Sequence, residues 1–318
     1  MASPATTDLH LDAALSTIST AYSNPDEALI GRELFPVVSV PKQSDKYFTW
    51  GKEYWLSINV EERADGDTYP EGLMSLSSTS FFANIYHLAF AISDEARMNE
   101  DPAVQLEATA AEWLAHQFRL HHENLLATDF FTTGVWGTDR TLAGTDQWSD
   151  FANSDPVSDV DTGHQTVQQA TGRRPNTLTV GQQVHDKLKF HPLLLDMYKH
   201  TGQSLLSTDA IRDSLGVQRY LVGSAVKNSA NVAATYSGSY VWGKNALLTW
   251  TPAAAGLRTP SAGYTFVWTG LDGGGGFEVP ISVVREDSRD RDMIRGKHAF
   301  DQKAVGTDLG YFMSAAVA

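Results

Sequence analysis

The 318-residue chain carries 38 acidic and 24 basic side chains, a formal net charge of −14, and it contains no cysteine. The absence of cysteine excludes a disulfide framework, a thiolate metal site and a cysteine nucleophile. The negative charge repels phosphate backbones and anionic lipid, so tight nucleic-acid binding is not expected. A hydrophobic content of 42% supports a buried core. We find no signal peptide and no apolar run long enough to span a bilayer, so we expect a soluble protein that stays in the cytoplasm where it is made.

The first 35 residues are expected to form an arm. Thr7 or Asp8 can cap a short helix that ends at Asn24-Pro25. Its apolar face would consist of Leu11, Leu15, Ile18 and Tyr22. Helices of this length are marginal on their own, so this face must dock on another element or another subunit.

In residues 35–92 the spacing of the apolar residues changes from the helical period to that of extended strands. Runs 46–59 and 81–92 are rich in aromatic and β-branched residues, and the polar stretch 60–80 between them contains turn signals. In the second run the apolar positions alternate, at Phe82, Tyr86, Leu88, Phe90 and Ile92. We therefore predict a long two-stranded excursion. It is either a hairpin at the edge of a large sheet or a ribbon that lies across a neighbouring molecule.

Residues 101–131 carry the longest helical pattern, with Asp101-Pro102 as its predicted start. Two apolar stripes follow the helical period: Val104, Ala108, Ala111, Ala115, Phe118 and Leu125 in one, Leu106, Ala110, Trp113, Gln117 and Leu120 in the other. Such a helix would be about 45 Å long. Something must be packed along each side of it.

The next segment alternates short strands and helices. Residues 132–160 look like a loop with short strands, and the pattern then predicts a mixed sheet flanked by helices. The expected helices are 162–170, one that starts at Gly181 and runs past His191-Pro192, and one capped by Ser207 or Thr208; the expected strands are 173–180, 217–222, 240–250 and 264–268, with an exposed loop at 223–237.

The glycine run 273–276 marks a turn or hinge, because it lacks the residues of a phosphate loop. Strands are predicted at 278–285, 293–305 and 309–317, with a charged turn at 286–292. We expect these strands to pack on the long helix.

Catalytic and metal-binding patterns are not evident. His116, His121 and His122 are spaced five and six apart, so they point in different directions, and we interpret them as surface histidines. Asp159 and Asp161 resemble the front of a calcium loop without the rest of its ligands, and helix capping by Asp161 or Thr162 is the simpler interpretation. We therefore expect no catalytic, cofactor or metal site.

Three segments carry a family resemblance: 30–50 (IGRELFPVVSVPKQSDKYFTW), 172–200 (GRRPNTLTVGQQVHDKLKFHPLLLDMYKH) and 280–312, in which VREDSRDRDMIRGKHAF precedes DLGYF. With the long helix between them, their order resembles the major capsid protein of tailed bacteriophages, the Hong Kong 97-type or Johnson fold. The resemblance implies an α+β fold with an N-terminal arm (1–35), an extended β-hairpin loop (36–93), a peripheral domain with the spine helix (94–174 and 281–318) and a mixed α/β axial domain (175–280).

The same resemblance implies a structural, non-enzymatic role in the virion. Pentamers and hexamers would assemble in the host cytoplasm into an icosahedral head that encloses double-stranded DNA without sequence-specific binding. Partners would be copies of the chain, a portal and a separate scaffolding or decoration protein, and no membrane. The residues expected between subunits are Tyr47, Phe48, Trp50, Tyr54, Trp55, Tyr69, Leu11, Leu15 and Ile18.

Alternatives remain at this point. Some family members crosslink the extended loop through a lysine, and Lys42, Lys46 and Lys52 are the lysines on the loop here, although solvated lysines on an edge strand are the simpler interpretation. An encapsulin-type nanocompartment shell would share the fold but enclose enzymes. A hydrolase that uses His and Asp side chains is a third hypothesis.

Overall fold

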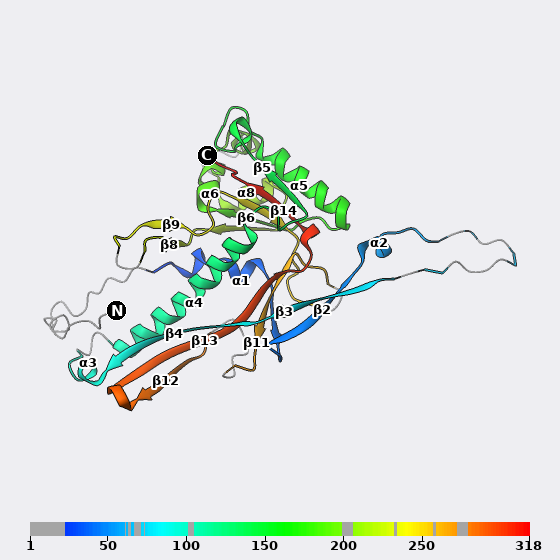
Figure 1. Ribbon diagram of the computed structural model, residues 1–318. Helices are drawn as coiled ribbons and strands as arrows, with labels where there is room; N and C mark the ends of the chain where they lie inside the picture. Colours follow the sequence, from blue (N-terminus) through cyan, green and yellow to red (C-terminus); the bar gives the residue numbers. More distant parts are fainter. Residues whose placement is uncertain are drawn as a thin grey trace.

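The computed structural model describes residues 23–60, 62, 65–66, 71–72, 74–100, 105–198, 206–231, 234–256, 259–271 and 279–318. The long helix α4 (Leu106–Phe130) lies between two five-stranded sheets, and a two-stranded ribbon projects from one side of the body (Figure 1). The chain is thus a mixed α/β fold.

The first sheet is organised by its longest strand, β13. The strand order is β1-β11-β13-β12, and β4 also pairs with β13, antiparallel, from Arg291↔Ser93 to Phe300↔Asn84. Even-numbered residues of β13 are mostly buried and odd-numbered ones are partly exposed, which is the period-two pattern of a sheet covered on one face. The strands are β1 (Val37–Val40), β4 (Asn84–Ser93), β11 (Gly263–Trp268), β12 (Ile281–Glu286) and β13 (Arg291–Ala304).

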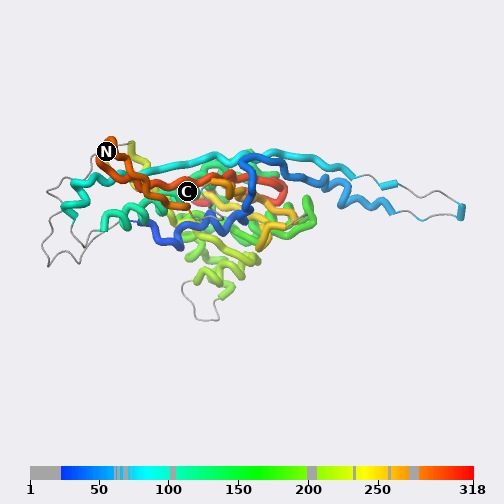
Figure 2. Tube along the Cα trace, turned by 90° about the horizontal axis from the view of Figure 1, so that it is seen from below, coloured from blue at the N-terminus to red at the C-terminus, as the bar shows by residue number. Residues whose placement is uncertain are grey.

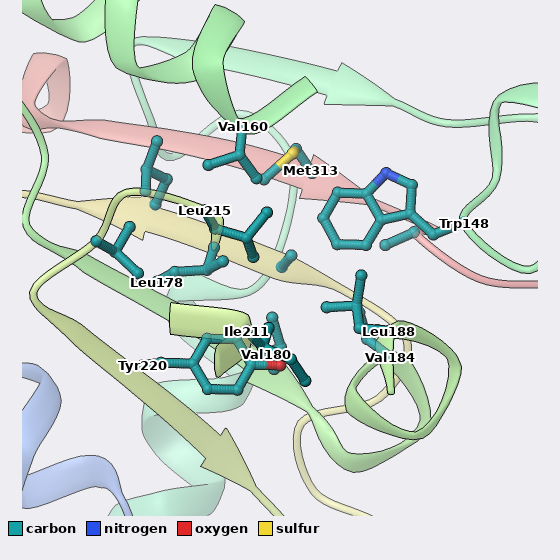
Figure 3. Close-up of a cluster of buried hydrophobic side chains, with 14 of the residues drawn as sticks. Trp148, Val160, Leu178, Val180, Val184, Leu188, Ile211, Leu215, Tyr220 and Met313 are labelled. Atoms are coloured by element: carbon teal, nitrogen blue, oxygen red, sulfur yellow. The ribbon is translucent and has the colours of Figure 1, made fainter. Parts of the chain in front are cut away.

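The second sheet has the order β5-β14-β10-β6-β7 and holds the largest cluster of buried side chains. Every residue of β6 and β10 is buried, as expected for strands covered on both faces. Figure 3 shows Trp148 and Met313 packed with aliphatic side chains from the helices of this part. The elements are β5 (Thr138–Thr141), α5 (Pro156–Thr171), β6 (Thr177–Gly181), α6 (Gln182–Leu188), α7 (Pro192–Met197), α8 (Thr208–Ser214), β7 (Arg219–Gly223), β10 (Ala246–Thr249) and β14 (Gly310–Ser314).

Two hairpin-like pairs and several short helices complete the chain. The ribbon consists of β2 (Ser44–Trp50) and β3 (Leu76–Phe82), and a second pair is formed by β8 (Val226–Asn228) and β9 (Gly238–Tyr240). The short helices are η2 (Asp26–Ala28), α1 (Gly31–Leu34), α2 (Lys52–Trp55), α3 (Asp94–Met98), η3 (Gly144–Asp146), η5 (Asp287–Arg289) and η6 (Thr307–Leu309).

The buried face of α4 differs from both predicted stripes. Its buried residues step mainly by four, and the row includes His122 and Glu123: Ala110, Leu114, Phe118, His122, Glu123, Leu126, Ala127 and Phe130. The reason is that α4 changes partner along its length. Its first half packs on Ile92 and Ile294 of the first sheet, and its last turns pack on side chains of the second sheet. The predicted start at Asp101-Pro102 lies outside the described residues, and the helix begins at Leu106.

The extended run 81–92 was wrongly predicted as one strand. It is interrupted at Ala83, so β3 pairs with β2 while β4 leaves to pair with β13. The first run, 46–59, also ends early, because α2 begins at Lys52. The expected hairpin therefore exists, but its second strand continues into the first sheet.

The bounds of other helices differ by a few residues from the predicted ones. The helix predicted at 162–170 begins at Pro156, with Asp155 accepting hydrogen bonds from the backbone of the first turn, so Asp161 and Thr162 are not its caps. It ends at Gly172, as predicted. The helix expected to run through His191-Pro192 is divided there into α6 and α7, since a proline cannot donate the backbone hydrogen bond that a continuous helix needs.

The C-terminal strands divide between the sheets. β13 packs on α4, as predicted, while β14 completes the second sheet between β5 and β10. The charged turn 286–292 is present between β12 and β13, and the glycine run 273–276 lies outside the described residues.

Candidate subunit-contact surfaces

The ribbon projects from the body as an isolated antiparallel pair. The register runs from Ser44↔Phe82 at its root to Trp50↔Leu76, and the two views show it leading away from the body towards α2 (Figures 1 and 2). A two-stranded hairpin is barely stable alone in water. A projecting pair of this kind therefore needs a firm root and a surface to lie on.

The root is an aromatic stack on the first sheet. The ring of Phe266 in β11 lies 4.4 Å from that of Phe81 and 5.8 Å from that of Tyr47, both nearly parallel to it. The Phe82 backbone N–H donates to Asp301 at 2.9 Å. Burial raises the pKa of the Tyr47 phenol above its ordinary value, because the neutral form is favoured away from water. Tyr47 is therefore a structural anchor in the subunit.

Beyond the root, the ribbon exposes large apolar side chains. Phe48 is 64% exposed, and beyond α2 Ile58 is 94% and Val60 is 90% exposed. Further exposed members of this surface are Trp55, Leu56, Met74 and Leu76. Large apolar side chains exposed along one projection are typical of a surface that binds another protein. We call these seven residues the ribbon surface.

The structure separates the predicted contact residues into four groups. Phe48 and Trp55 are exposed on the ribbon; Trp50 and Tyr54 are partly buried, and the rings of Trp50 and Trp55 meet edge to face at 6.4 Å. Tyr47 packs into its own subunit. The other four predicted residues lie outside the described residues: Tyr69, Leu11, Leu15 and Ile18.

Sequence reasoning missed Ile58 and Val60. They lie in the segment LSINV, in which apolar and polar residues alternate, and that alternation was a usable signal. Residues 56–59 were predicted to belong to the extended run 46–59, and Val60 to the polar stretch that follows it. Among the described residues the segment follows α2 without pairing to a strand, and the side chains of Ile58 and Val60 are exposed.

A second feature fastens the N-terminal segment to the body through Glu123. This α4 carboxylate is 1% exposed and accepts hydrogen bonds from the backbone N–H of Ile30 at 2.8 Å, that of Gly31 at 2.7 Å and the indole N–H of Trp242 at 2.7 Å. A methyl group at Gly31 would lie 2.5 Å from the carboxylate, so only glycine fits there. We call Glu123 and these three donors the arm joint, because it fastens the start of α1 to α4.

The electrostatics of the arm joint are balanced between two effects. Burial raises the pKa of Glu123 to about 7, whereas the three N–H donors act in the opposite direction by favouring the carboxylate. Burial of an ionised carboxylate is costly unless it is fully hydrogen-bonded. The joint therefore depends on all three donors being in place.

The interpretation of all three helix histidines as surface residues was wrong. His122 is 2% exposed and its ring lies 5.2 Å from that of Phe300, while His121 is partly buried against Tyr86. Burial lowers the pKa of His122 well below its ordinary value, so the ring is held neutral. The adjacent pair looked polar in sequence, and only the position of β13 shows that one ring is covered.

The candidate calcium segment is occupied by ordinary structural contacts. Asp159 is on α5, where its carboxylate accepts from the Trp148 indole at 2.9 Å and pairs with Arg140 at 2.6 Å. Across the described ranges, no group of three or more His, Asp or Glu side chains is arranged to hold a metal ion. None of the helices in those ranges combines the length and apolar character needed to cross a membrane.

No protein-family model matches the sequence. Two curated proteins are similar over almost their whole length. The major capsid protein of Burkholderia phage BcepMu is 26% identical over 311 residues, which cover 96% of this chain and 96% of that protein. The major capsid protein of Pseudomonas phage JBD67 is 27% identical over 330 residues, 97% of each.

Solved structures share the fold. A phage-related protein from Bordetella bronchiseptica RB50 has a TM-score of 0.70 at 21% identity, covering 92% of this chain and 94% of that one. The mature capsid of bacteriophage PhiM1 has a TM-score of 0.57 at 11% identity, covering 96% and 91%. Along nearly its whole sequence the chain is similar to two phage major capsid proteins, and it shares its fold with a phage capsid structure, in agreement with the resemblance to tailed-phage major capsid proteins seen in the sequence.

Proposed function

We propose that this chain is the shell-forming subunit of a tailed-phage head, a structural protein with no catalytic role. The observation that carries the proposal is the ribbon surface, which exposes seven large apolar side chains on a projection that its own subunit does not cover. Similarity to two phage major capsid proteins over almost the full length supports the same role. Obligate interfaces of this kind commonly bury ~2,000 Å² or more.

The finer architecture that we propose is the Hong Kong 97-type fold with the predicted bounds. Residues 1–35 are the arm, 36–93 the extended loop, 94–174 with 281–318 the peripheral domain, and 175–280 the axial domain. The projecting ribbon and the long helix α4 support this assignment. Because β5 and β14 pair within the second sheet, the two peripheral segments each contribute one strand to the sheet of the axial domain.

In the proposed shell, the ribbon surface lies across a neighbouring subunit. Phe48, Trp50, Tyr54 and Trp55 supply the contacts near α2, and Ile58, Val60 and Met74 extend them. Subunits form pentamers and hexamers around double-stranded DNA, together with a portal and a separate scaffolding or decoration protein. Head-to-tail contacts that close into rings are the symmetry such a shell requires.

The predicted alternatives are less well supported. Both curated relatives are named major capsid proteins, which favours a phage head over an enzyme-filled nanocompartment or a hydrolase. For self-crosslinking, Lys52 already lies 2.5 Å from Asp308 of its own chain, and Lys42 lies 3.9 Å from Asp45. We propose that subunits are held together without a lysine crosslink.

Negative-stain electron microscopy of the purified full-length protein tests the proposal. We expect shells or ring-shaped capsomers, and a uniform population of monomers would overturn it. Nuclease-protected DNA inside native particles would distinguish a phage head from a nanocompartment.

A pair of variants tests the ribbon itself. Phe48→Ser with Ile58→Ser removes two exposed ribbon side chains, and Phe190→Ser with Met197→Ser removes two exposed ones near α7 as the control. Burial of two such side chains contributes about 3–5 kcal/mol per contact, or roughly a 10²–10⁴-fold change in its equilibrium constant. We expect only the ribbon variant to remain unassembled with an unchanged circular dichroism spectrum. Normal shells from that variant would refute the role of the ribbon surface.

A further inference from the structure

Three histidine side chains gather where α4 packs on the first sheet. His121 and His122 lie in the second half of α4 and His298 lies on β13, and α4 packs on both β13 and β4 (Figure 1). The rings of His122 and His298 lie 5.2 and 5.0 Å from that of Phe300, and the ring of His121 lies 4.6 Å from that of Tyr86 on β4. Tyr86 and Phe300 are 4.8 Å apart, so the five rings form one packed group, which we call the histidine cluster.

The histidine cluster is shielded from water. His122 is 2% exposed and His298 is 6% exposed, while His121 is partly buried. A charged imidazolium loses its hydration when it is buried, so the uncharged ring is favoured at these positions. Burial is the largest cause of the lowered pKa values of His121 and His122, and the two neighbouring histidines lower the pKa of His122 further.

The buried carboxylate beside the cluster loses its charge before the histidines gain theirs. Glu123 follows His122 in α4, and burial raises the pKa of Glu123 to about 7, so it takes up its proton first as the pH falls. Asp301 of β13 is already engaged, because it accepts from the Phe82 backbone N–H at 2.9 Å and pairs with Lys303 at 3.6 Å. A protonated cluster therefore gains little compensation from these carboxyl groups.

Two further charged groups face the cluster from the surface. Asp129 acts on the phenol of Tyr86, as Asp301 does. Lys227 lines the same surface hollow as His121, so it adds positive charge on that side. Charges at the surface are screened by water and salt, and they influence a buried group less than its packed neighbours do.

We propose that the histidine cluster is an acid-sensitive joint, in which protonation of the three imidazoles loosens α4 from β13. Each proton adds a positive charge beside two others in a group of packed rings, where repulsion between like charges is stronger than in water. The position matters because α4 changes partner next to the cluster. Its first half packs on the first sheet through Leu114, and its last turns pack with the second sheet through Leu126. Loosening the joint lets the two sheets shift relative to each other.

The direction of the pH dependence follows from burial. In the unfolded chain a histidine takes up its proton near pH 6.5, whereas in the folded chain His122 stays neutral to a much lower pH. The contribution of His122 to stability is therefore fully present above pH 6.5 and is lost as the pH falls towards its folded pKa. For each histidine that stays neutral when folded, the equilibrium constant for unfolding rises about tenfold per pH unit below 6.5.

A single variant and a matched control test the joint. His122→Gln removes one buried imidazole, and His87→Gln removes an exposed one from β4. Urea unfolding of full-length, unassembled subunits gives the unfolding constant at each pH. Between pH 7.5 and 5.5 we expect this constant to rise about tenfold more for the wild type and for His87→Gln than for His122→Gln. A loss of stability that is the same at every pH leaves this ratio unaffected, and an equal pH dependence in all three proteins would overturn the proposal.

Hydrogen exchange of the wild type locates the loosening and needs no variant, so it decides the matter if His122→Gln does not fold. After correction for the intrinsic effect of pH on exchange, we expect residues 114–126 and 294–302 to lose protection between pH 7.5 and 5.5, while residues 156–171 of α5 keep theirs. Unchanged protection of the first two segments would overturn the proposal. Loss of protection in all three would assign the acid effect to the whole subunit and would overturn it as well. Neither measurement depends on whether the protein forms shells.

Discussion

At the arm joint, the direction in which the free energy of unfolding changes with pH depends on two competing effects on the pKa of Glu123. Glu123 is buried, and burial raises its pKa from an ordinary 4.5 to about 7. A carboxyl group whose folded pKa is raised binds its proton more tightly in the folded state than in the unfolded state. Its contribution to stability is then fully present below pH 4.5 and is lost as the pH rises towards 7.

The magnitude follows from the two pKa values. Each pH unit between them corresponds to about 1.4 kcal/mol, so Glu123 alone lowers the free energy of unfolding by about 3 kcal/mol between pH 4.5 and 8. The variant Glu123→Gln does not titrate. Every other group is shared between the two proteins, so the difference in unfolding free energy, variant minus wild type, should rise by about 3 kcal/mol over this range.

Urea unfolding of unassembled subunits, followed by tryptophan fluorescence at a series of pH values, measures this difference. The same substitution at exposed Glu112 reports the effect of removing one charge from α4 without touching the arm joint. A difference that stays constant with pH would show that burial does not raise the pKa of Glu123. A difference that falls with pH would show that the N–H donors of Ile30, Gly31 and Trp242 outweigh burial and hold the carboxylate.

Three further substitutions follow from the same contacts. Gly31→Ala places a methyl group 2.5 Å from Glu123, so we expect a loss of about 1–3 kcal/mol of unfolding free energy in urea titrations. Phe266→Ala removes the ring that anchors the ribbon, which should cost about 3–5 kcal/mol and make the ribbon the first site of limited proteolysis. Asp159→Asn removes the charge of a buried carboxylate that pairs with the partly exposed Arg140, so we expect a lower melting temperature in scanning calorimetry, with a loss of about 1–3 kcal/mol.

Each of these three substitutions has a matched control variant. A methyl group at Gly72 would meet no atom within 4 Å, so Gly72→Ala should leave the unfolding free energy nearly unchanged. Phe48→Ala removes an exposed ring of the ribbon without loosening its root, and Asp161→Asn changes a half-exposed carboxylate on the same helix as Asp159. Controls that lose as much stability as their partners would contradict the contacts assigned to Gly31, Phe266 and Asp159.

Local sequence was sufficient to predict secondary structure wherever one segment determines its own conformation. The long helix, the two aromatic runs, the stop at Gly172 and the cap at Ser207, whose side chain accepts from Ala210, were all predicted. Periodicity, capping and turn chemistry act over a few residues, so they can be recognised without the fold. The order of these elements was enough to indicate the family.

The buried polar residues were not predictable in this way. Glu123 and His122 looked like surface residues of an amphipathic helix, and the interruption at Ala83 looked like the middle of one strand. Each depends on a partner more than ninety residues away in sequence: the Ile30 and Gly31 backbone for the carboxylate, and β13 for the strand. No local pattern encodes such a distant partner.

The sequence by itself therefore determined the elements of this protein, their order and the absence of thiol chemistry. The tertiary structure alone decided which face of α4 is buried and that Ile58 and Val60, beyond α2, are exposed. The physical reason is that burial is a property of two surfaces brought together. A chain specifies one of them locally, and the other is supplied by strands and loops that only folding brings alongside.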